Sequence, residues 1–332
     1  MRTIAVLFLL LASVYSHAET PQVSIAPYYH GCRAALSLTF DDGLLDQYTL
    51  AFPQLRQRGL KATFAVIGSK VGGIIRSKQD RLDGVDGTPC MTWAMLRELA
   101  VDGQEIASHG WEHRAVTRLS PEALRHEVEA NDSAIAANIP AAMGKGGLRP
   151  RSYFFPGNNK TPETIVFVEQ GRVACRTFQT SVGSKRTAPF LRQYADDLIA
   201  DGEWGVTMTH GISRGYDHFQ DPQVFWDFLD YICTKQQQLW IATFSDVAAY
   251  VKERDHTTLR VKQTARGLTV TPATRLDKAI YCHPLTLSTH APIASATQDG
   301  RQLTVIHKGD STLIDFNPHG GKIVIKFIMH NS

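Results

Sequence analysis

The chain has little net charge, no closely spaced cysteines and no internal repeats, and each absence excludes a class of protein. Its 332 residues include 35 lysines and arginines against 32 acidic residues, and no basic run stands out, which argues against a nucleic-acid-binding protein. The five cysteines lack Cys-x-x-Cys spacing, which argues against a cysteine-based zinc site. We expect them mainly as buried small side chains, with one or two disulfides at most.

The N-terminal segment is typical of a secretory signal peptide. Met1-Arg2 gives a positive start, residues 4–11 are apolar, and Ser16-His17-Ala18 ends with small residues at both positions that matter for cleavage. This pattern predicts a signal peptide over 1–18, cleaved near Ala18, and a secreted or periplasmic protein. The alternative is a membrane anchor, which the apolar run disfavours because a bilayer-spanning helix needs ~20 apolar residues. No later stretch is apolar enough to span a membrane.

Strand-like and helix-like segments alternate through residues 34–250. The strand-like runs are 34–40, 62–67, 105–108, 153–155, 204–209 and 239–244. Such alternation indicates parallel strands joined by crossover helices, so we expect an α/β domain at 19–254. After residue 255, short alternating runs separated by turns such as Asp299-Gly300 predict a small β-sandwich-like domain of five to seven strands at 255–332. Residues 70–90 are expected as a long loop over the strand ends.

Polar side chains that could take part in catalysis or metal binding follow several of the predicted strands. They are Asp41-Asp42 after 34–40, His109 after 105–108, and His210 after 204–209. Parallel α/β barrels have their active sites at this end of the strands. His109 and His113 are four residues apart and can face the same way. Because two imidazoles and one carboxylate bind a divalent metal and leave positions open, the sequence predicts a catalytic metal site with a spare aspartate beside it.

Four segments resemble the motifs of the polysaccharide deacetylases, which are carbohydrate esterases of family 4 with a NodB-homology domain. These segments are Thr39-Phe40-Asp41-Asp42-Gly43, Ser108-His109-Gly110-Trp111-Glu112-His113, Phe154-Phe155-Pro156-Gly157 and Thr207-Met208-Thr209-His210-Gly211. They occur in the family's order over about residues 34–250, and the first two are the most specific. The resemblance implies a distorted (β/α)7 barrel of the NodB-homology type.

The resemblance also implies roles for individual residues. Asp42, His109 and His113 would bind one divalent metal ion, Zn²⁺ or else Co²⁺, Ni²⁺ or Fe²⁺. Asp41 would be the general base and His210 the general acid. The groove would be lined by Phe155, Pro156 and Gly157, with the Gly157 N–H facing the oxyanion. The implied substrate is an N-acetylated polysaccharide or oligosaccharide, such as a chitin-like glycan, peptidoglycan or an exopolysaccharide; the oligomeric state is not indicated.

Phe154 departs from the family pattern. Many members have an arginine at this position, two residues before the proline, and that arginine positions the base. Arg149 and Arg151 are nearby, but nothing in the sequence shows that either replaces it. The partner of Asp41 is therefore not predicted, and Asp197 and Asp201 are candidate partners for His210.

Three alternative functions remain open from the sequence. The same site could remove O-acetyl groups, for example from xylan. The chain could also be a catalytically inactive, carbohydrate-binding relative, since the arginine is missing. A non-haem iron oxygenase also uses two histidines and one carboxylate, but the order of the aspartate before His-x-x-x-His and the alternating α/β pattern disfavour it.

Overall fold

The computed structural model describes residues 22–76, 78–82, 86–144, 149–264 and 266–328. The expected signal peptide at 1–18 lies outside the described residues and stays a prediction. Among the residues that are described, no helix combines the length and the apolar character needed to cross a membrane.

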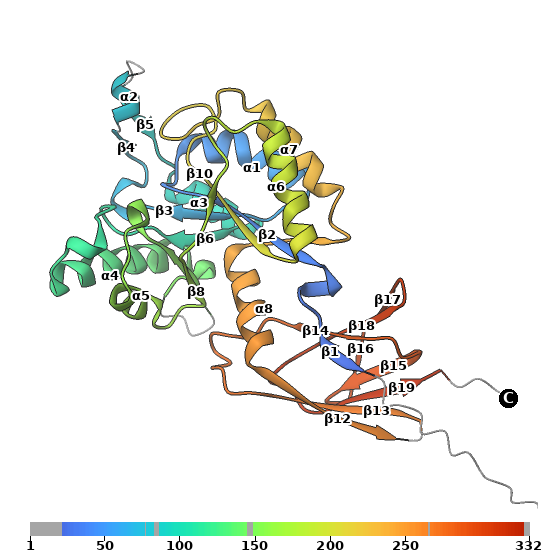
Figure 1. Cartoon of the computed structure of the whole chain (residues 1–332). Coiled ribbons are helices and arrows are strands. Elements are labelled where there is room, and N and C mark those ends of the chain that lie inside the picture. Colours follow the sequence, from blue (N-terminus) through green and yellow to red (C-terminus); the bar gives the residue numbers. More distant parts are fainter. Residues whose placement is uncertain (1–21, 77, 83–85, 145–148, 265, 329–332) are drawn as a thin grey trace, which may run out of the picture.

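A curled parallel sheet forms the centre of the larger part of the fold (Figure 1). Its path through the described residues is β8 (Ala174–Arg176), β7 (Ser152–Phe154), β6 (Glu105–Ser108), β3 (Thr63–Val66), β2 (Ala34–Phe40), β10 (Trp204–Thr209) and β9 (Thr180–Ser181). A further strand, β11 (Leu239–Ile241), pairs with the first residues of β2, and every pairing in this sheet is parallel. The sheet curls into a half-barrel, which confirms the expected fold class.

Helices cover the outer side of this sheet (Figure 1). They are α1 (Phe52–Gln57), α3 (Trp93–Val101), α4 (Pro121–Asn138), α5 (Pro162–Glu169), α6 (Ala188–Asp201), α7 (Gln223–Cys233) and α8 (Phe244–His256). Thr92 and Ser120 cap α3 and α4, because their side chains accept the backbone N–H groups of Met95 and Ala123. All seven residues of β2 are buried, so this strand lies at the middle of the hydrophobic core.

The described residues between 70 and 90 form an arm with its own helix and strands, where the sequence predicted a long loop. β4 (Ile74–Ile75) pairs antiparallel with β5 (Thr88–Pro89), and the short helix α2 (Lys78–Leu82) lies between them. The arm projects from the barrel beyond β3 (Figure 1). Thr88 donates a hydrogen bond to Asp80 at 2.5 Å, which ties β5 to α2.

The C-terminal region is all-β, as expected, but it has more strands than the sequence indicated. The described strands after residue 255 are β12 (Thr257–Thr264), β13 (Gly267–Thr274), β14 (Leu285–Thr289), β15 (Ile293–Gln298), β16 (Arg301–Leu303), β17 (Val305–Lys308), β18 (Ser311–Phe316) and β19 (Ile323–Phe327). The number predicted was too low because β14 and β15 are rich in serine and threonine and alternate weakly. β1 (Val23–Ile25), from the N-terminal end, pairs with β14.

Two antiparallel sheets build this region, β12-β13-β19-β15-β16 and β1-β14-β18-β17. Their apolar side chains form one cluster, which includes Val270, Leu285, Ile314 and Ile325. Tyr250 of α8 is buried in the same cluster, so the last helix of the α/β part anchors the β region. Its hydroxyl donates to the backbone carbonyl of Ala26 at 2.8 Å, which fixes the start of the described chain.

Candidate active site

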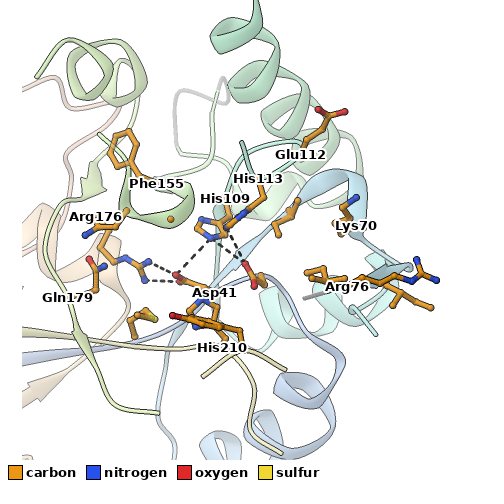
Figure 2. A pocket seen from close by; sticks show the side chains of 18 residues that line it. Asp41, Lys70, Arg76, His109, Glu112, His113, Phe155, Arg176, Gln179 and His210 are labelled. Atoms are coloured by element: carbon orange, nitrogen blue, oxygen red, sulfur yellow. Dashed lines mark hydrogen bonds and ion pairs between the residues drawn. The ribbon is translucent and has the colours of Figure 1, made fainter. Parts of the chain in front are cut away.

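Adjacent parallel strands bring the chemically active residues to one edge of the sheet. Asp41 and Asp42 directly follow β2, His109 follows β6, and His210 follows β10. Because β6, β3, β2 and β10 are neighbours in the sheet, the residues after their carboxyl ends converge. They line a pocket of about 710 Å³, together with His113 (Figure 2).

Asp42, His109 and His113 have the geometry of a metal-binding triad. Oδ1 of Asp42 lies 3.5 Å from Nε2 of His109 and 3.6 Å from Nε2 of His113. All three donor atoms lie within 4.8 Å of one another. A tetrahedral ion with bonds of about 2.0–2.1 Å separates its ligand atoms by about 3.4 Å. Since Asp42 Oδ1 is also buried without a hydrogen-bond partner among the described residues, the three side chains fit a divalent metal ion.

The two histidines are prepared as ligands in different ways. Nδ1 of His109 lies 2.8 Å from the carbonyl oxygen of Phe154; donation to it leaves Nε2 free to face Asp42. Burial lowers the pKa of His109, but Asp41 and Asp42 outweigh this and raise it overall. Burial, together with the neighbouring His109, lowers the pKa of His113 to about 4. His113 is therefore neutral near pH 7 and offers a lone pair.

Asp41 is held by a buried arginine, Arg176, at the end of β8. Nη1 of Arg176 donates to Oδ1 of Asp41 at 2.8 Å, and Nη2 donates to Oδ2 at 2.5 Å. The arginine and aspartate side chains are 4% and 6% exposed. Burial alone raises the pKa of Asp41, but the Arg176 guanidinium, helped by His109, holds it well below the ordinary value. Asp41 is therefore an oriented, ionised carboxylate beside the triad.

Arg176 is the partner of Asp41 that the sequence did not reveal. Its guanidinium carbon lies 4.0 Å from the ring centroid of Phe154, so the aromatic residue at the family's arginine position packs against the arginine found here. Arg149 and Arg151 do not serve this purpose, because they pair with carboxylates on α4 and α8.

Gln47 links the segments that carry Asp41 and His210. Its side-chain amide donates to the carbonyl oxygens of Asp41 at 2.6 Å and of His210 at 2.8 Å. The side chain itself is fully buried, so neither bond competes with water. These two hydrogen bonds hold the backbone at Asp41 close to the backbone at His210.

His210 lines the pocket, and among the described residues no carboxylate forms a hydrogen bond with its ring. Its Nδ1 is buried and has no hydrogen-bond partner in the described part of the chain. The ring meets Tyr216 edge-on, with 4.8 Å between centroids. Asp197 and Asp201, the candidate partners from the sequence, lie on α6, and Asp197 accepts a hydrogen bond from Gln193 instead. No described hydrogen bond joins either aspartate to His210.

The segment Phe155, Pro156 and Gly157 forms a tight turn beside the triad. Phe155 and Gly157 line the pocket, whereas Pro156 is buried. Gly157 has φ of +58°, a conformation that favours glycine. The sequence-predicted groove residues thus reach the pocket at two of three positions.

The pocket rim carries charged and polar groups that the sequence did not single out. Gln179 lies on the same side of Asp41 as Arg176, whereas Lys70 and Arg76 lie on the opposite side, toward the arm (Figure 2). Arg76 pairs with Asp86 at 3.3 Å, and both side chains are exposed.

Comparisons with known proteins agree with the motifs. Residues 30–168 match the family model described as polysaccharide deacetylase. YxkH of Bacillus subtilis (strain 168), whose name describes it as a polysaccharide deacetylase, is 32% identical over 91 residues. That match spans 27% of this chain and only 28% of the relative.

Solved structures with a similar arrangement have low sequence identity. The peptidoglycan deacetylase PdaC from Bacillus subtilis is 19% identical, with a TM-score of 0.45, over 67% of this chain and 93% of that one. A family 4 carbohydrate esterase from Streptomyces lividans is 20% identical, with a TM-score of 0.44, over 63% and 92%. BA3943 of Bacillus anthracis, described as a CE4 family pseudoenzyme, is 13% identical, with a TM-score of 0.46, over 65% of each chain. Residues 30–168, which contain the acidic pair and the two spaced histidines, are thus similar to the polysaccharide deacetylase family.

Proposed function

We propose that this protein is an exported, metal-dependent hydrolase that removes N-acetyl groups from a polysaccharide or oligosaccharide. The observation that carries the proposal is the convergence of Asp42, His109 and His113, with all donor atoms within 4.8 Å, beside the ionised carboxylate of Asp41. The resemblance to the family 4 deacetylases implies this combination of three metal ligands and a separate base. The composition of the ligand set favours Zn²⁺, with Co²⁺, Ni²⁺ or Fe²⁺ as alternatives.

Asp42, His109 and His113 would hold a divalent ion, which would supply a water of lowered pKa, toward ~7, and polarisation of the acetyl carbonyl. Asp41 accepts the proton of the attacking water, and Arg176 keeps its carboxylate ionised and oriented for that transfer. Gly157 lines the pocket, and its backbone N–H would bind the oxyanion; one well-placed donor contributes about 3–4 kcal/mol. His210 donates a proton to the leaving amine, because an amine is a poor leaving group unless it is protonated.

The proposed substrate is a chitin-like glycan, peptidoglycan or an exopolysaccharide. The pocket supports this because its volume is about 710 Å³ and charged side chains of both signs, such as Glu112, Lys70 and Arg76, line it. The leader-like N-terminal segment supports a substrate outside the cytoplasm.

An acetate-release screen with purified protein tests the proposal. The substrates are N-acetylglucosamine oligomers, peptidoglycan glycan and acetylated xylan, each with and without a chelator. We expect acetate from an N-acetylated substrate, its loss with chelator, its return with Zn²⁺ or Co²⁺, and its loss in Asp41→Asn with metal content unchanged. Release from acetylated xylan alone would identify an O-acetyl esterase. No release from any substrate by metal-loaded protein would contradict the proposal, and oxygen uptake would favour an oxygenase.

A further inference from the structure

A buried carboxylate outside the triad lies beneath the loop that carries His113. Glu127, on α4, is only 1% exposed. Its Oε1 accepts the backbone N–H groups of Glu112 at 3.1 Å and Arg114 at 3.0 Å, and its Oε2 accepts that of Glu112 at 3.1 Å. These two N–H groups belong to the residues on either side of His113. The Glu127 carboxylate therefore binds the backbone around this proposed metal ligand and not its imidazole ring.

The backbone of this loop has a conformation that needs such support. His113 has φ of +63°, in the left-handed region, where a non-glycine residue costs about 1 kcal/mol or more. Gly110 also has a positive φ, and a Cβ there would collide with Oε1 of Glu127. The carboxylate thus occupies the space that the missing side chain leaves. Without it, two N–H groups would lose their acceptors and the loop could relax to an unstrained conformation.

The same face of α4 also fixes the strand that leads into the loop. One turn after Glu127, Asn131 donates to the carbonyl oxygen of Val66 at 2.9 Å and to the hydroxyl of Ser108 at 3.0 Å. In addition, the backbone N–H of Trp111 donates to the backbone oxygen of Glu127 at 2.8 Å. Helix α4 therefore holds the segment from Ser108 to Arg114 in place through several hydrogen bonds.

We propose that Glu127 is a positioning residue for the metal site: it holds His113 in the left-handed conformation in which its Nε2 lies 3.6 Å from Asp42 Oδ1. This inference rests on the metal site of the proposed function. It makes Glu127 a determinant of metal affinity, although the residue contacts neither metal nor substrate. It also gives a reason for a carboxyl group buried against the backbone of this loop.

Zn²⁺ affinity, measured by competition with a chromophoric chelator, tests the role of Glu127 without an activity assay. We expect Glu127→Ala to weaken Zn²⁺ binding about 10- to 100-fold, the range typical for groups that orient metal ligands. Glu127→Gln keeps one carbonyl oxygen that can accept both N–H groups, so it should recover most of that loss. The absorption spectrum of the Co²⁺-loaded protein should change in the alanine variant, because the position of His113 changes.

Asp132 on the same helix provides the matched control. Its buried carboxylate accepts two hydrogen bonds from Arg172, at 2.7 and 2.6 Å, and no described hydrogen bond joins it to the loop. Asp132→Ala should lower the melting temperature at least as much as Glu127→Ala but leave Zn²⁺ affinity unchanged. Wild-type affinity in Glu127→Ala, or equal weakening in Asp132→Ala, would overturn the inference alone. Failure of the wild-type protein to bind any divalent metal would overturn the proposed function and this inference together.

Discussion

Replacing Arg176 with methionine removes the guanidinium from Asp41 and leaves a side chain of similar length against Phe154. Both charged side chains are almost fully buried and joined by two hydrogen bonds of 2.8 and 2.5 Å. Removing one partner of such a pair costs about 3–5 kcal/mol, because the other charge stays buried. His109 still faces Asp41 at 3.9 Å, so we expect the lower end, about 3 kcal/mol, in the metal-free protein.

The same substitution should change the pH dependence of catalysis. In the wild-type protein the pKa of Asp41 lies well below its ordinary value, so the carboxylate is ionised across the neutral range. Without the Arg176 guanidinium, the effect of burial, which favours the neutral carboxyl group, is no longer outweighed to the same degree. The pKa of Asp41 should therefore rise. The acidic limb of kcat/KM should therefore move to higher pH. Loss of the oriented base should lower kcat by about 10²- to 10⁴-fold.

Chemical denaturation and acetate release across pH measure these effects, and Arg151→Met is the control. Arg151 pairs with Asp246 at 2.7 Å, but the two side chains are 31% and 33% exposed. A pair this exposed contributes about 0–1 kcal/mol, and its loss should leave the acidic limb in place. If Arg176→Met were within about 1 kcal/mol of the wild type and kept its acidic limb, the assignment of Arg176 to Asp41 would be refuted.

Three further outcomes follow from the described contacts. His113→Ala should abolish tight Zn²⁺ binding but barely change the melting temperature of the metal-free protein, because this side chain is 36% exposed; calorimetry in chelator would detect a contrary loss. Burial raises the pKa of Asp246, but the ion pair with Arg151 outweighs this and lowers it. Its contribution is therefore present above the unfolded pKa of about 3.9 and lost as pH falls through the lower folded pKa, so the drop in melting temperature caused by Asp246→Asn at pH 7 should shrink as the pH falls below about 4. Burial raises the pKa of both Cys90 and Cys175 to about 12, so mass spectrometry should find these thiols unlabelled by iodoacetamide at pH 8 while the protein is folded.

Much of the barrel and the triad could be predicted from the sequence because the signals are local. Short apolar runs mark buried strands, and each is followed directly by the residue that it delivers, as β2 is followed by Asp41. Thr92 and Ser120 are helix caps that can be identified from their neighbours alone. When several parallel strands are each followed by such a residue, these residues meet at the same edge of the sheet. Their proximity can therefore be predicted without knowing how the side chains pack.

Residues that act across the fold gave no such signal. Arg176 ends a strand of only three residues, and its partner lies 135 positions earlier in the chain. β1 pairs with β14, so a segment near position 24 belongs with the C-terminal region, which no local pattern indicates. Glu127 looks like an ordinary helix glutamate in the sequence, and only the fold shows that it lies under the loop at Gly110.

The positions of Phe154 and Arg176 suggest why the family's arginine can be absent from its usual strand. β7 and β8 are adjacent parallel strands, and Phe154 and Arg176 are partners in their register. Paired residues of neighbouring strands point to the same face of a sheet and lie about 4.8 Å apart, a gap that an arginine side chain can span. The sheet therefore offers two neighbouring positions from which a guanidinium can reach Asp41.

This reasoning predicts that the two side chains can be exchanged. The double variant Phe154→Arg with Arg176→Phe restores both a guanidinium and a flat ring to the same face of the sheet. We expect its acetate release to exceed that of Arg176→Phe alone by at least about 10-fold, equivalent to 1.4 kcal/mol. The double variant should also regain part of the lost free energy of unfolding, because Asp41 again has a buried cationic partner. If the exchange recovers neither quantity, then the role of Arg176 depends on the exact position of β8, and the register between the two strands does not explain the missing arginine.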